Sequence, residues 1–135
     1  MGYFYYNPNP LGRVNAGDCT VRAITKVLEN EGYDWDKTYA SLAIYGMRYG
    51  EMPSANSVWG SFLIDNGFVE QPIMKKCKEC YTVDRFCIDH PKGTFVVCTD
   101  SHAIAVIDGN VWDSFDSRDM YPTYYFEKSE VTSNE

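Results

Sequence analysis

Residues 15–29 (NAGDCTVRAITKVLE) place a cysteine where a loop turns into a helix. Cys19 follows Gly17 and Asp18, and an apolar pattern with helical spacing includes Val21. A helix N-terminus presents unpaired backbone N–H groups and a partial positive charge, and both stabilise a thiolate. We therefore expect Cys19 to be an activated nucleophile in the first turn of a helix.

A nucleophilic thiol needs a base, and the chain has two histidines. His102 opens the apolar segment HAIAVI, which is predicted to be a central, buried strand. From there its ring can reach a cleft while the strand holds its backbone rigidly. His90 ends a short predicted helix and precedes Pro91, which favours a surface or capping role. We predict His102 as the partner of the thiol.

A hairpin turn predicted at Asp108-Gly109-Asn110 supplies an acid for this pair. If the turn is centred on Gly109, Asp116 lies directly opposite His102, where it can accept the second ring N–H and fix the tautomer. A two-residue turn would shift the register by one position and bring Asp113 to the face of His102. We prefer Asp116 and keep Asp113 as the alternative.

Two segments carry a resemblance to the papain-like cysteine peptidase superfamily. GDCTVRAI (residues 17–24) is similar to the nucleophile motif of ovarian-tumour-type deubiquitinases and of bacteriocin-processing peptidases. SHAIAVIDGNVWDSFD (residues 101–116) resembles the histidine-to-acid hairpin that those families share with transglutaminase-like enzymes. The overall layout also resembles that of small uncharacterised phage-type proteins.

The resemblance implies a catalytic triad. Cys19 would be the nucleophile, His102 the general base and acid, and Asp116, or Asp113, the residue that orients the histidine. The implied activity is hydrolysis of an amide, peptide or isopeptide bond in a protein or peptide substrate, through a thioester and without a cofactor.

The oxyanion hole departs from the family pattern. Papain-like enzymes often carry a glutamine six residues before the cysteine, but Arg13 occupies that position here. Asn15, four residues before Cys19, is the candidate replacement, together with the backbone N–H of Cys19 itself.

Further cysteines raise other hypotheses. Cys77 and Cys80 have the two-residue spacing of a zinc knuckle, and Cys87 and His90 follow downstream. We favour no metal site and keep a structural zinc at these four residues as an alternative. It would accompany a non-enzymatic binding or effector module on a papain-like scaffold. A deamidase or acyl transferase with the same triad is the remaining alternative.

Bulk properties limit the partners. The chain has 135 residues and a formal net charge of −7, which disfavours nucleic acid because phosphate binding needs clustered Lys and Arg. It shows no apolar run near the roughly 18 residues of a membrane span and no leader-like start. We expect a cytoplasmic monomer with reduced cysteines and no membrane partner.

Periodicity predicts one α+β domain, and the resemblance implies that its architecture is papain-like. An extended arm and loop over 1–17 and a helical part over 18–90 precede an antiparallel sheet over 94–126 and a polar tail over 127–135. Helices are predicted over 18–29, 35–49, 54–66 and 83–89. Strands are predicted over 68–73, 94–99, 102–107, 111–115 and 121–126.

Overall fold

A computed structural model describes residues 2–74 and 80–129. These residues form an α+β structure, as predicted, with four α-helices and one six-stranded mixed sheet. The helices are α1 (Cys19–Val27), α2 (Trp35–Tyr49), α3 (Asn56–Asp65) and α4 (Val83–Asp89), with a short 3₁₀ turn at Glu29–Glu31. The strands are β1 (Tyr3–Tyr5), β2 (Phe68–Pro72), β3 (Thr94–Cys98), β4 (Ala103–Ile107), β5 (Asn110–Asp113) and β6 (Tyr124–Lys128).

The sheet is larger than the antiparallel sheet predicted over 94–126. Its strand order is β1-β5-β4-β3-β6-β2, and β1 runs parallel to β5, with Tyr3 opposite Val111. The N-terminal arm and β2 therefore pair with the two outer strands of the C-terminal meander, whose backbone groups would otherwise lack partners. An all-antiparallel sheet confined to the C-terminal part was a wrong prediction.

The last strand also differs from its prediction. β6 begins at Tyr124, after Pro122, and Glu127 pairs with both Val69 of β2 and Phe95 of β3. The first residues of the predicted polar tail are thus part of the sheet. Phe126 of this strand is buried in one core, and its neighbour Tyr125 packs from the opposite face against the other core.

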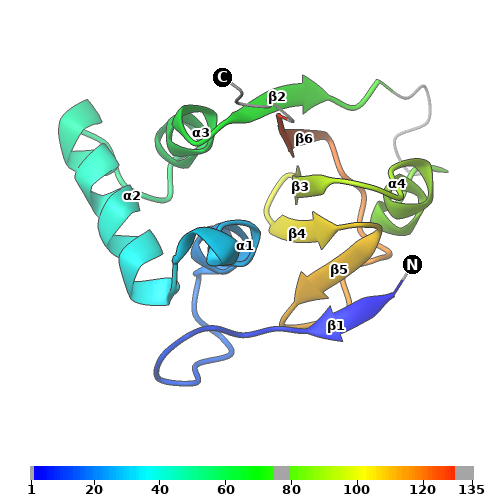
Figure 1. Cartoon of the computed structure of the whole chain (residues 1–135), viewed down its shortest axis with the longest axis horizontal. Coiled ribbons are helices and arrows are strands. Elements are labelled where there is room, and N and C mark those ends of the chain that lie inside the picture. Colours follow the sequence, from blue (N-terminus) through cyan, green and yellow to red (C-terminus); the bar gives the residue numbers. More distant parts are fainter. Residues whose placement is uncertain (1, 75–79, 130–135) are drawn as a thin grey trace.

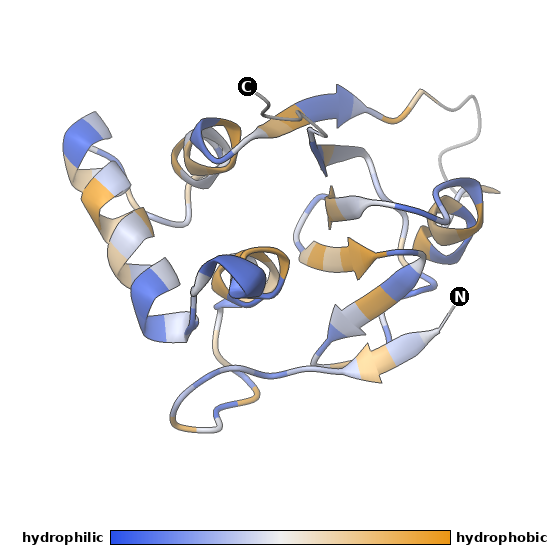
Figure 2. Ribbon diagram, viewed as in Figure 1, coloured by the Kyte–Doolittle hydropathy of each residue, from blue (hydrophilic) through white to orange (hydrophobic). Residues whose placement is uncertain are grey.

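Helices cover both faces of the sheet (Figure 1). The three helices α1, α2 and α3 enclose one apolar core against one face, and α4 packs a second core against the other. β4 lies between β5 and β3 and is apolar on both faces, as its sequence predicts (Figure 2). Among the described residues, no helix combines the length and the apolar character that crossing a membrane requires.

Two helices begin and end at the residues that the sequence indicates. The Asp34 side chain accepts a hydrogen bond from the Lys37 N–H at the start of α2, and Gly50, at a φ of 65°, ends that helix. The Thr82 side chain accepts from the Arg85 N–H at the start of α4. Local capping chemistry is sufficient to set these boundaries.

The loop between α2 and α3 packs tightly on Gly46. The Glu51 N–H donates to the Gly46 carbonyl at 2.9 Å, and a Cβ added to Gly46 would lie 2.7 Å from the Glu51 carbonyl oxygen. The same added atom would lie 3.3 Å from the backbone nitrogen of Pro53. Gly46 is therefore needed for the close approach that positions residues 52–54.

We predict that Gly46→Ala destabilises the protein. Alanine normally stabilises a helix by about 1 kcal/mol relative to glycine, but here the methyl group meets backbone atoms that cannot rotate away. Overpacking of this kind costs about 1–3 kcal/mol, so urea unfolding should show a net loss in the free energy of unfolding. Ser41→Ala, on the exposed side of the same helix, is the control and should change it by less than about 0.5 kcal/mol. A stabilised Gly46→Ala protein would contradict the prediction.

Candidate active site

Cys19 is the first residue of α1 and lies at one end of the sheet. The start of β4 and the end of β5 meet at this same end, next to α1 (Figure 1). α1 begins here because the Arg22 N–H donates to the Asp18 carbonyl at 2.8 Å, and Val21, Ile24 and further residues bury its apolar face. The sulfur is partly exposed and lines a pocket, as an accessible nucleophile must.

Asp18 precedes the helix but does not cap it with its side chain. Its carboxylate instead accepts hydrogen bonds from Trp35 Nε1 at 2.9 Å and Asn9 Nδ2 at 3.2 Å, and it forms a buried ion pair with Arg22. The first-turn amides beside Cys19 are therefore not taken up by this carboxylate. Their partial positive charge remains directed at the sulfur.

His102 immediately precedes β4, and its ring is held by Asp113. His102 Nε2 donates to Asp113 Oδ2 at 2.7 Å. Ser117 Oγ donates to the same oxygen at 2.8 Å, and the Ser114 N–H donates to Oδ1 at 2.7 Å. Arg22 Nη2 lies 3.9 Å from Oδ1. Since Nε2 is engaged, Nδ1 is the ring nitrogen left for Cys19.

The electrostatics of Cys19 favour the thiolate. Burial opposes its ionisation, but hydrogen bonds from His102 and from the backbone N–H of Ala103 outweigh it, helped by the positive charges of His102 and Arg22. The pKa of Cys19 is thus lowered. Burial also opposes the charged form of His102, yet the hydrogen bonds to Asp113 and Cys19 raise its pKa to about 9. Between the two pKa values the pair is a thiolate and an imidazolium.

The other free cysteines of the described residues have the opposite character. Burial raises the pKa of Cys87 to about 11 and that of Cys98 to about 12. Both side chains are buried in the cores. Of these three thiols, Cys19 is the one placed to react near neutral pH.

The prediction that Asp116 is the acid opposite His102 was wrong, and the alternative, Asp113, accepts the hydrogen bond from the ring. The turn has two residues, Asp108 and Gly109, at φ values of 51° and 77°, and it pairs Ile107 with Asn110. This register places Asp113 on the same face as His102.

Asp116 lies beyond the end of β5. Its two carboxylate oxygens are exposed to solvent and accept from Arg118 Nε at 2.9 Å and Nη2 at 2.8 Å. The chain bends at Ser114 and Phe115, and Phe115 lies against His102 with ring centroids 5.0 Å apart, whereas Asp116 pairs with Arg118.

The predicted role of Asn15 is not supported by its position, because Asn15 is exposed and lies outside the pocket beside Cys19. That pocket has a volume of about 160 Å³. It contains Cys19 and His102, and its remaining lining is polar and aromatic, including Asn56, Trp59, Thr99, Ser101 and Tyr124.

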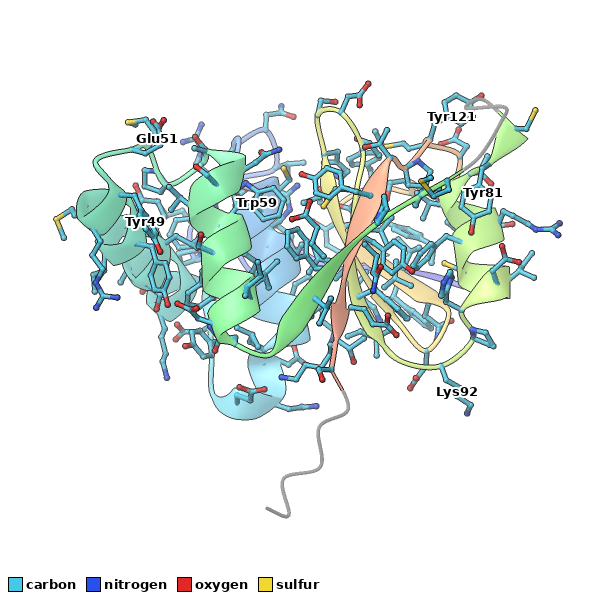
Figure 3. The ribbon with its side chains drawn as sticks, turned by 90° about the horizontal axis from the view of Figure 1, so that it is seen from above. Tyr49, Glu51, Trp59, Tyr81, Lys92 and Tyr121 are labelled. Atoms are coloured by element: carbon cyan, nitrogen blue, oxygen red, sulfur yellow. The ribbon has the colours of Figure 1, made fainter. Side chains whose placement is uncertain are left out.

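Trp59 adds a hydrogen-bond donor that sequence analysis missed. Its side chain projects from α3 toward the sheet (Figure 3), and it is only 3% exposed. Within the described residues, the indole N–H has no hydrogen-bond partner. A buried donor without an acceptor costs folding free energy.

Arg22 and Ser117 were also missed. The sequence places Arg22 on the predicted helix but does not distinguish it from the other residues between the apolar positions. Its role as a buried counterion follows only from its position between Asp18 and Asp113. Ser117 lies four residues after Asp113 and outside any regular element, so no periodic pattern identifies it.

The four zinc candidates fall in different surroundings. Cys77 lies outside the described residues, and Cys80 is disulfide-bonded. Cys87 is buried in the core beneath α4, and His90 Nδ1 is 3.0 Å from the Phe86 carbonyl oxygen. Over residues 2–74 and 80–129, no three His, Cys, Asp or Glu residues are grouped so as to hold a metal ion.

A larger open hollow of about 440 Å³ lies elsewhere on the surface. Its lining is Thr82, Asp84, Asp116, Arg118 and Asp119, which supplies charge but neither a thiol nor an imidazole. The chemistry-bearing groups converge on the smaller pocket at Cys19.

Comparisons with protein-family models, with curated proteins and with solved structures each gave no match.

We predict that Asp113→Asn lowers the pKa of His102, because the amide cannot balance the imidazolium charge. Loss of a charged hydrogen bond of about 1.5–3 kcal/mol corresponds to about 1–2 pKa units. An NMR titration of the His102 ring measures the change, with His90 as the internal reference. Asp116→Asn is the matched control and should leave the His102 pKa in place; equal effects of the two variants would refute the assignment.

Proposed function

We propose that this chain is a cysteine-dependent hydrolase of amide, peptide or isopeptide bonds, built on a papain-like fold. The observation that carries the proposal is the line of contacts from Cys19 through His102 to Asp113, together with the lowered pKa of Cys19. A cysteine that serves packing alone has its pKa raised by burial, as Cys98 does.

In the first half of the reaction the Cys19 thiolate attacks the substrate carbonyl carbon and a C–S bond forms. The carbonyl electron pair moves to oxygen, and the backbone N–H at the start of α1 donates to this oxyanion. When the tetrahedral intermediate collapses, the C–N bond breaks and the imidazolium of His102 gives its proton to the leaving amine. The products of this half are a thioester on Cys19 and the free amine.

In the second half water cleaves the thioester. Neutral His102 takes a proton from water, and the resulting hydroxide attacks the thioester carbonyl. The C–S bond breaks, the carboxylic acid leaves, and the thiolate–imidazolium pair is restored. Asp113 acts as a positioning residue because it holds the ring and balances its charge through both steps.

The modest volume of the pocket favours a second candidate, a deamidase or acyl transferase that uses the same thioester. A pocket of about 160 Å³ fits a side-chain amide or a chain end more readily than a long peptide. The acceptor of the acyl group separates the transferase, which uses an amine, from the hydrolase and the deamidase, which both use water. The deamidase is distinguished from the hydrolase by its leaving group, which is ammonia.

The proposal predicts selective alkylation of Cys19. At pH 7, iodoacetamide should modify Cys19 in the native protein before the buried Cys87 and Cys98, as followed by peptide mapping. The alkylation rate should persist below the ordinary thiol pKa of about 8.5, because the lowered pKa keeps the thiolate present there. In His102→Ala the rate at pH 7 should fall on the order of tenfold, and its pH profile should shift upward.

The matched control for this experiment is His90→Ala, which removes the other histidine of the chain. Its Cys19 rate and pH profile should equal those of the unaltered protein. Equal slow labelling of all free cysteines, or a Cys19 that reacts only after denaturation, would eliminate the proposal. Thioester formation with p-nitrophenyl acetate, followed by mass spectrometry with water or an added amine as acceptor, then separates the hydrolase from the transferase.

A further inference from the structure

A second pocket of about 220 Å³ adjoins the pocket at Cys19. Three residues, Gly17, Thr20 and Ser54, line both pockets and form their common wall. One ligand can therefore place a reacting carbonyl beside Cys19 and extend a group across this wall. The second pocket lies between the start of α1, the middle of α2 and the loop that Gly46 positions.

The lining of the second pocket is mainly apolar. It is provided by Val21, Tyr39, Leu42, Met52 and Pro53. Tyr39 is 51% exposed and Met52 is 65% exposed, so a bound apolar group would remove apolar surface from water at these two side chains.

The single carboxylate among the lining residues presents no free charge to a ligand. Asp18 is paired with Arg22 and accepts from Asn9 and Trp35. A cationic ligand would thus find no unpaired anion here, and an anionic ligand would face a chain of net charge −7. Because Asp18 is already paired and the lining of the second pocket is mainly apolar, this pocket favours an uncharged apolar group.

The volume agrees with an amino-acid side chain. An apolar cavity of roughly 150 Å³ is enough to hold a benzene-sized molecule. The larger volume here accommodates a branched aliphatic or an aromatic side chain.

We propose that this pocket binds the apolar side chain of the substrate residue whose carbonyl is attacked by Cys19. The substrate is then a peptide or acyl amide with a residue such as leucine or phenylalanine on the acyl side of the cleaved bond. This specificity rests on the proposed function, since it requires the reacting carbonyl to lie beside Cys19.

Affinity labels test the proposal. In N-acetyl-leucine chloromethyl ketone the Cys19 thiolate forms a C–S bond at the methylene carbon, and chloride leaves with the electrons of the C–Cl bond. Its labelling rate, divided by that of iodoacetamide, should exceed the same ratio for N-acetyl-aspartate chloromethyl ketone by about tenfold or more. Equal ratios for the two labels would overturn the apolar specificity.

Met52→Glu tests the pocket itself, because Met52 lines it and is 65% exposed on a loop, outside the folded core. It should lower the leucine-label ratio about tenfold by placing a charge at the pocket. Met47→Glu is the matched control, since Met47 is 75% exposed on α2 and does not line the pocket. It should keep the full preference, and equal losses in the two variants would contradict the proposal.

A binding measurement separates this proposal from the proposed function. In Cys19→Ser protein labelled at the methionine methyl groups, N-acetyl-leucine amide should shift the NMR signal of Met52 and leave that of Met47 in place. N-acetyl-aspartate amide should shift neither signal. Unselective iodoacetamide labelling would defeat the hydrolase proposal, whereas an unshifted Met52 signal would defeat the pocket proposal.

Discussion

Asp113 carries a carboxylate that is only 3% exposed, and a charge so far from water must be met by donors. Hydrogen-bond donors come from His102, which precedes β4, and from Ser114 and Ser117, which follow β5. Arg22 of α1 adds a positive charge at 3.9 Å. Satisfying this one group therefore brings together the sheet end and the helix that carries the thiol. Loss of any donor would leave part of the charge unmatched, which is the reason the geometry is narrowly defined.

Charges alternate along the buried network from Asp18 to Arg22, Asp113, His102 and Cys19. Each charge has neighbours of the opposite sign, which offset part of the cost of burying it. Because Asp18 serves as a counterion for Arg22, its side chain is not used as a helix cap. The start of α1 thus keeps its partial positive charge for the sulfur. The Asp18 carboxylate serves as a counterion and not as a helix cap, and the uncapped amides of the first turn favour the thiolate of Cys19.

The walls of the two pockets depend on a different contact, the packing of the loop over residues 50–55 against Gly46. This loop carries Met52, Pro53 and Ser54 to the edge of the pockets, while Trp59 follows on α3. The loop is held by backbone hydrogen bonds to the end of α2, including the Glu51 N–H to the Gly46 carbonyl. The binding surface and the reacting groups are consequently supported by separate contacts. Changes to the loop can alter what binds without altering the charge network.

The sequence by itself determined the helices, the buried central strand and the places of Cys19 and His102 in them, because these depend on local spacing and caps. Cys19 begins a helix and His102 opens an apolar strand whatever the partners are. The tertiary structure decided which acid contacts His102. A turn longer by one residue would place Asp116 on the face of His102, whereas the two-residue turn places Asp113 there. The Asp108-Gly109 pair is typical of two-residue turns and was the sequence signal for this register. The tertiary structure also decided the parallel edge strand β1 and the buried place of Arg22, since strand pairing and charge burial are set between segments far apart in the chain.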